Sequence, residues 1–361
     1  MPDEIWVYRL YDVAQEIDLD AIEHRLQDER PTARLKLSKV RPKALEIKNP
    51  PLSFMIDSEA RVPLAGTMCS AEIGARFYDF GVLSIVMRIR LPETIDWTLM
   101  MRYAETLLAE ETPEIDQRFQ AYRDDILRRF GEHLTGEGYR NYVEDFIIFA
   151  VGDWPEDDEW SPLPILLGEK GPLSEALIED ALRYRFSYDA DDVIIAWDSA
   201  WVEDPEGPGD VADLLEFAKA QLLELRYYDD LLDRELSALY DVLSADGTER
   251  AEWLRFGRLQ KTRAVMRRIM ELIVEITEFT GRIENALKVT QDFYYARIYT
   301  AAVERFRMRE WSESIREKMA VLERHYELLA DESISARFIW IDTLILLLIF
   351  FEIIIGLLTL R

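Results

Sequence analysis

The sequence predicts an α+β domain, a long antiparallel helical region and one C-terminal transmembrane helix, in that order. Three observations support this prediction. Short runs of alternating apolar and polar residues are interspersed with helical patterns in the first part of the chain. Apolar residues at heptad spacing follow a Pro- and Gly-rich stretch, and the last residues are almost uniformly apolar. We therefore expect three parts, at residues 1–203, 204–334 and 335–361.

The composition restricts the class of protein before any motif is considered. The 361 residues carry a formal net charge of −27, which argues against a surface that binds nucleic acid or anionic lipid as a whole. Apolar residues make up 49%, enough for a sizeable core. The single cysteine, Cys69, excludes an internal disulfide and a Cys-rich zinc site.

Strand and helix patterns alternate in the first part. From Leu83 to Leu91 every second residue is large and apolar, which predicts a half-buried strand, and Asp79-Phe80-Gly81 is a turn that joins it to a strand ending at Phe77. Further strands are expected at Ile5–Tyr11, Arg34–Val40, Phe146–Val151 and Val193–Trp197, and helices at Asp20–Gln27, Asp96–Ala109, Pro113–Phe130 and Leu173–Tyr184. This mixture predicts an α+β domain, with ferredoxin-like units as one arrangement.

The second part begins after the acidic, Pro- and Gly-rich stretch Glu203–Asp210, which we interpret as a linker. Helix-forming residues then run to about Ser244, and a turn centred on Asp246 follows. Apolar residues at alternating spacings of three and four predict a helix up to Ala286 and another that leads into the apolar C-terminus. The pattern predicts an antiparallel coiled-coil bundle.

Opposite charges on the first two of these helices predict ion pairs across the hairpin. Folding about the turn sets Asp229 opposite Arg263, and Asp233 opposite Arg258 or Lys261. We therefore expect these five residues to form structural ion pairs.

The same acids allow a second interpretation. Asp229, Asp230 and Asp233 have a spacing that can hold magnesium and a diphosphate, because carboxylates at i and i+4 share a helical face. Such a site needs a second acidic motif on a facing helix, which the sequence lacks. A metal-dependent enzyme is therefore the alternative function, and the structural ion pairs are preferred.

The C-terminus is the strongest signal in the chain. Thr343 to Leu360 are 18 residues with one charge, Glu352, and as a helix they would span roughly 27 Å, close to the thickness of the bilayer core. This predicts a single-pass tail anchor, with the bulk of the chain on the cytoplasmic side of a membrane, most readily the bacterial inner membrane. Glu352 and Gly356 share a face, where they would contact a second copy of the span, so we expect a homo-oligomer.

One basic patch contrasts with the overall acidity. Its members that are candidates for interaction are Arg34, Lys36, Lys39, Arg41 and Lys43. They could meet anionic lipid or RNA, but pairing with nearby acids is favoured in so acidic a protein. Nucleic acid is otherwise not expected, no motif implies a cofactor, and no catalytic motif is recognisable.

The sequence Ser335-Ala-Arg-Phe-Ile-Trp340, followed by an apolar run up to Glu352, resembles the "required for meiotic nuclear division" family, whose bacterial members are YagE-like proteins. That family has a similar Ser-x-Arg-Leu-Glu-Trp stretch, although Ile339 stands here in place of its Glu. Asp79-Phe80-Gly81 is a second, weaker similarity. The resemblance implies a membrane-anchored scaffold, in mitochondrial relatives one that supports translation, and it brings no catalytic residues. We therefore expect a non-enzymatic, tail-anchored scaffold that holds an unidentified protein partner.

Overall fold

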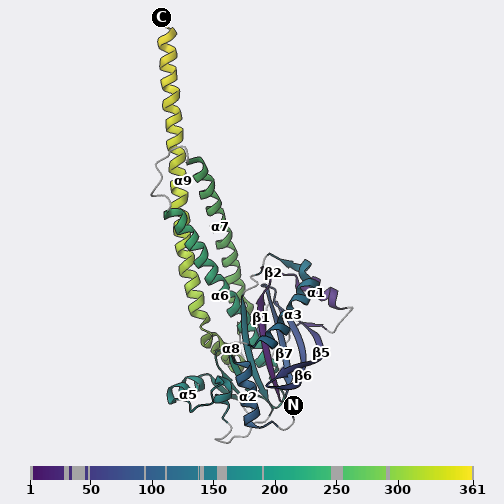
Figure 1. Ribbon diagram of the computed structural model, residues 1–361. Helices are drawn as coiled ribbons and strands as arrows, with labels where there is room; N and C mark the ends of the chain where they lie inside the picture. The colour runs from purple at the N-terminus through teal and green to yellow at the C-terminus, as the bar shows by residue number, and fades with distance from the viewer. Residues whose placement is uncertain are drawn as a thin grey trace. The chain divides into compact units, whose positions relative to one another are not determined.

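A computed structural model shows the fold of the protein (Figure 1). It describes residues 3–27, 32–34, 45–47, 49–92, 95–109, 112–136, 138, 142–152, 161–188, 191–244, 255–289 and 293–359. The chain divides into two compact units. The first comprises residues 1–227 and 281–311, and the second comprises residues 228–280 and 312–361.

A nine-stranded sheet forms the centre of the first unit. Its order is β10-β11-β12-β9-β1-β7-β6-β5-β3, and every neighbouring pair is antiparallel except β12 and β9. The strands are β1 (Glu4–Asp12), β3 (Thr32–Arg34), β5 (Leu52–Leu64), β6 (Thr67–Phe77), β7 (Val82–Arg90), β9 (Val143–Val151), β10 (Arg185–Tyr188), β11 (Asp191–Ile195) and β12 (Ser199–Glu203). One extended sheet therefore replaces the ferredoxin-like units that we considered.

Helices and two small sheets complete this unit. The helices are α1 (Leu19–Gln27), α2 (Trp97–Leu107), α3 (Pro113–Phe130), the 3-10 turn η1 (Gly131–His133), α4 (Pro162–Leu167), α5 (Glu175–Leu182), the first part of α6 (Gly209–Ser244) and α8 (Phe293–Arg305). The small sheets pair β2 (Glu16–Ile17) with β8 (Leu134–Thr135), and β4 (Leu45–Ile47) with β13 (Leu287–Val289).

The two faces of the sheet carry different helices. Side chains alternate along a strand, so Ile5 and Val7 of β1 enter a large apolar core together with residues of α1, α2 and α3. The intervening positions lie on the face that α6 covers. There Arg76 of β6 donates to Glu216 of α6, and Lys219 of α6 lies 5.2 Å from the ring of Phe146, the β9 residue opposite Tyr8. The strand predicted at Leu83–Leu91 is confirmed as β7, but Ser84 on its more polar face is only 1% exposed because α6 covers that face.

The predicted turn between β6 and β7 is also confirmed. The backbone N–H of Tyr78 donates to the carbonyl of Val82, and Gly81 has a φ of 104°. A Cβ atom at Gly81 would lie 1.9 Å from the carbonyl oxygen of Ala14. Both the backbone conformation and the close approach therefore require glycine at this position.

The second unit is helical. It contains the remainder of α6, most of α7 (Arg255–Ala286) and most of α9 (Met308–Thr359). Within it Tyr228 packs against Phe279, and Glu235 pairs with Arg268. Because a residue further along α6 meets one earlier in α7, the two helices are antiparallel.

The predicted transmembrane helix is wrong. Helix α9 includes residues 343–359, but in the part of the chain that the structure describes no helix offers an apolar stretch long enough to cross a bilayer. The fold class therefore has to be corrected to a mixed α/β protein with a helical unit. Four predictions depended on the transmembrane helix and are no longer supported. They are the tail anchor, the membrane as a partner, the location at the bacterial inner membrane and an oligomer made by paired spans.

Candidate functional site

Helix α6 carries a stripe of charged residues that is buried in the first unit. Asp210, Glu216 and Lys219 are at most 3% exposed, and Asp213 lies between them at the same spacing of three residues. Residues three apart are neighbours on a helix surface, and because three residues fall short of a full turn, the stripe winds around α6. Buried charges need partners, and strands of the sheet supply them for Asp213, Glu216 and Lys219.

Arg76 of β6 is the partner of two of these acids. Its guanidinium donates to Glu216 at 2.6 Å, to Asp213 at 2.8 Å and to Ser53 at 2.8 Å. Burial disfavours the charged guanidinium, but the two carboxylates more than offset this and raise the pKa of Arg76. Burial raises the pKa of Glu216, and Arg76 opposes that shift. This cluster ties α6 to the sheet in one register.

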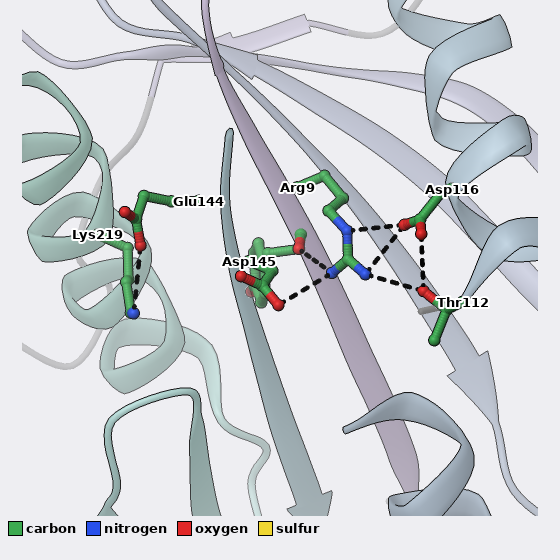
Figure 2. A network of polar contacts seen from close by, with 7 residues as sticks. Arg9, Thr112, Asp116, Glu144, Asp145 and Lys219 are labelled. Atoms are coloured by element: carbon green, nitrogen blue, oxygen red, sulfur yellow. Dashed lines mark hydrogen bonds and ion pairs between the residues drawn. The ribbon is translucent and has the colours of Figure 1, made fainter. Parts of the chain in front are cut away.

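Lys219 lies one turn further along α6. Its Nζ atom is 3.6 Å from Glu144 of β9 (Figure 2). The rings of Phe146, Trp197 and Phe306 surround it at 4.6–5.5 Å. Burial lowers the pKa of the Lys219 ammonium, and Glu144 opposes the shift. Burial also raises the pKa of Glu144, which Lys219 and Arg226 oppose. The result is a desolvated ion pair inside an aromatic box.

A second network lies on the opposite face of the sheet. Arg9 of β1 donates to Asp116 at 3.2 Å and to Thr112 at 3.3 Å, and it lies 4.0 Å from Asp145 (Figure 2). Because adjacent residues of a strand point in opposite directions, Asp145 contacts Arg9 on this face and Glu144 pairs with Lys219 on the other. The Arg9 network attaches the start of α3 to the sheet.

The chemistry open to these networks is limited by access. A lysine with a lowered pKa can act as a nucleophile or a base. Lys219, however, is 0% exposed and enclosed by three rings. We therefore assign the charged stripe a structural role in seating α6 on the sheet.

The acids predicted on α6 lie in the helical unit, where Lys318 of α9 binds them. The Nζ atom of Lys318 is 2.8 Å from Asp229 and 2.7 Å from Asp233, and Ser314 donates to Asp229 at 2.6 Å. The lysine ammonium thus takes the place between the carboxylates that a metal ion would need. Among the described residues no group of three or more His, Cys, Asp or Glu is arranged to hold a metal, so nothing here favours the alternative that includes Asp230.

The predicted partners of these acids are Arg258, Lys261 and Arg263, whose side chains lie outside the described part of the structure. Their pairing stays a prediction. A charge pair across the α6–α7 hairpin does exist, between Glu235 and Arg268. Our register would have set Gly257 opposite Glu235, so the observed register is displaced along α7.

The predicted basic patch is described only at Arg34. This residue contacts Asp20 at 2.5 Å and Glu23 at 2.8 Å, and it donates to the carbonyl of Pro50. Arg34 therefore pairs with nearby acids, as the favoured interpretation expected. Lys36, Lys39, Arg41 and Lys43 lie outside the described residues.

The end of α9 presents the largest group of exposed apolar side chains in the described residues. Glu352 is exposed among them, and the exposure of Gly356 is outside the described part. We call this group the α9 apolar stretch. Its members, between 47% and 67% exposed, are Ile345, Leu346, Leu347, Leu348, Ile349, Phe350, Phe351, Ile353 and Ile355.

Sequence reasoning missed the buried stripe of α6. A signal for it existed, because Asp210, Asp213, Glu216 and Lys219 recur every three residues among apolar neighbours. The partners carried no comparable signal, because Arg76 and Glu144 lie in strands that hold other polar residues, such as Glu72 and Asp145.

The fold and these networks define a mixed α/β protein in which the first part of a long helix packs on a nine-stranded sheet through buried charges. A family model described as "Uncharacterized protein MJ0711, N-terminal domain" matches residues 2–210, which is more than half of the chain, and the chain belongs to this family. The matched region contains the whole sheet, with Arg76 and Glu144, and ends where α6 begins. The resemblance to the "required for meiotic nuclear division" family was therefore wrong.

One curated relative is "Uncharacterized protein MJ0711" of Methanocaldococcus jannaschii. It is 22% identical over 224 residues, which cover 60% of this chain and 66% of the archaeal protein. No solved structure matches the chain.

Proposed function

We propose that this is a non-enzymatic interaction protein, a scaffold that holds a protein partner through the α9 apolar stretch. The observation that carries the proposal is the exposure of every member of that stretch. Its nine large apolar side chains are each about half exposed.

The size of this surface supports the proposal. Large apolar side chains present on the order of 150–200 Å² each when fully exposed, so nine half-exposed ones present roughly 800 Å². Monomers rarely expose more than a few hundred Å² of contiguous apolar surface. A standard protein–protein interface takes about 800 Å² from each partner. The stretch is therefore large enough to support a stable interface.

The chemistry of the stretch indicates the partner. The stretch is helical, which favours a partner with an apolar groove that receives a helix. Glu352 is its single charged residue. A partner that buries the stretch must pair this carboxylate, so we expect a basic side chain in the groove opposite Glu352.

A photocrosslinking amino acid at Leu346 of the full chain, in the cells that produce it, tests the proposal. We expect a crosslink to a defined protein, mapped by mass spectrometry to an apolar groove with a basic residue near position 352. Glu352→Lys should abolish the crosslink, and Glu352→Gln should retain most of it. Leu328 is 61% exposed on the same helix but outside the stretch, and it serves as the control position.

Two results would overturn the proposal. The first is an equal yield of the same crosslink from Leu328, which would show that proximity alone is responsible. The second is crosslinking of Leu346 to lipid and not to protein.

A further inference from the structure

A cavity of about 580 Å³ opens on the α6 face of the sheet. It lies between Glu4 and Trp6 of β1, Arg88 and Arg90 of β7, and the turn that leads into α6 at Gly209. This volume lies in the range of small-molecule sites. The cavity belongs wholly to the first unit and is separate from the α9 apolar stretch.

Arg88 is a cation without a polar partner in this cavity. Glu72 lies directly opposite Arg88 in the β6–β7 register, yet the guanidinium stacks on the Trp6 ring at 4.2 Å. Its Nε atom is buried and has no hydrogen-bond partner, and no ion pair of Arg88 is found among the described residues. Guanidinium groups bind carboxylate and phosphate oxygens through paired N–H donors, so this group is available to an anion.

The other charges around the cavity are mostly engaged. Glu72 pairs with Arg90. Glu4 accepts a hydrogen bond from the Trp6 indole at 2.7 Å. Glu206 is exposed to solvent. Glu72 and Glu4 are thus occupied, whereas the guanidinium of Arg88 has no ion pair among the described residues.

The start of α6 adds a second attraction for an anion. The first backbone N–H groups of a helix lack partners within the helix, and its N-terminus carries a partial positive charge. α6 begins at Gly209 and runs for 36 residues. A Cβ atom at Gly209 would meet nothing within 4 Å, so the space over this backbone is open.

We propose that this cavity binds the anionic oxygen group of a small molecule, a carboxylate or a phosphate, between the Arg88 guanidinium and the start of α6. Trp6 holds the guanidinium by stacking, which keeps its donors from turning to Glu72. The inference is independent of the proposed function, because it uses no residue of α9.

Calorimetric titration of the full chain with inorganic pyrophosphate, and separately with succinate, tests the proposal and distinguishes the two anion classes. We expect saturable binding of at least one probe at one site. Arg88→Gln should weaken it at least tenfold, because a hydrogen bond to a charged group is lost. Arg185→Gln, which removes an exposed arginine paired with Asp192, should leave the affinity unchanged.

A matched pair at Gly209 keeps the test independent of folding defects. Gly209→Asp places a carboxylate in the open space at the helix start, where acids are favourable, and should weaken probe binding at least tenfold. Gly209→Ala adds a Cβ atom without a carboxylate and should bind as the native chain does. Absence of saturable binding of both probes to the folded native chain would overturn the proposal. Unchanged affinity in both Arg88→Gln and Gly209→Asp would also overturn it.

Discussion

Replacing Arg76 with Met should strongly destabilise the α/β unit. Arg76 donates to Glu216 at 2.6 Å and to Asp213 at 2.8 Å, and its own side chain is 10% exposed. Removing the cation leaves a carboxylate that is only 3% exposed without its ion-pair partner. Breaking a buried pair in this way costs about 3–5 kcal/mol. Chemical unfolding followed by tryptophan fluorescence should show this loss in the free energy of unfolding.

A second substitution separates the ion pair from general packing. In the double variant Arg76→Met with Glu216→Met, the unpaired carboxylate is gone, so about 2 kcal/mol or more of the loss should be recovered. Arg90→Met is the matched control, because Arg90 is 52% exposed in its pair with Glu72. That variant should lose less than about 1 kcal/mol.

The loss should also depend on pH with a defined sign. In Arg76→Met the cation that opposed the effect of burial is absent, so the pKa of Glu216 rises further above its ordinary value of 4.5. A raised carboxyl pKa means that the folded state binds the proton more tightly than the unfolded state. The destabilisation should therefore be smallest near pH 4.5 and grow as the pH rises through the raised pKa. A loss below about 1 kcal/mol at pH 8, or one that does not change with pH, would refute the reasoning.

Three further substitutions test other parts of the structure. Lys318→Met should destabilise the helical unit by about 1 kcal/mol. Burial opposes the charged ammonium, but hydrogen bonds to two aspartates raise the pKa of Lys318 above 10.5. The native chain should therefore be more stable than the variant below pH 10.5 and lose this difference as the pH rises through the raised pKa, which denaturation followed by circular dichroism at pH 8 and pH 11 would show. Ala65→Asn should stabilise the protein by about 0.5–1 kcal/mol and so raise the midpoint of thermal unfolding. Both residues of the Ala65-Gly66 hairpin loop have positive φ, and Asn-Gly suits such a loop best. A lowered midpoint would contradict this. Gly81→Ala should cost about 3 kcal/mol or more, because its Cβ would overlap a carbonyl oxygen, and a native yield of folded protein with unchanged melting would show the contact to be tolerant.

Local patterns predicted part of the α/β unit well and missed other elements, such as β5. The helix expected at Pro113–Phe130 has those bounds as α3, and the strands expected at Ile5–Tyr11 and Phe146–Val151 lie within β1 and β9. These elements follow from the spacing of apolar residues, which depends only on the neighbours in the chain. The resemblance to the "required for meiotic nuclear division" family was wrong because it depended on a short stretch of residues. It rested mainly on C-terminal residues around Trp340, whereas the family match lies at residues 2–210.

The sequence by itself therefore determined β1, β7, β9, α3 and the glycine turn at residue 81, because short-range periodicity and backbone sterics specify them. It missed β5, β10, β12, α4 and α8. Only the tertiary structure decided which polar residues are buried and what they bind. Arg76 occupies a polar position in the alternating pattern of β6, as an exposed residue would, yet it is buried because Glu216, 140 residues later, lies on the helix that covers it. In the same way Arg88 faces a cavity in place of solvent. Periodicity tells which face of a strand a side chain occupies, but not which helix covers that face.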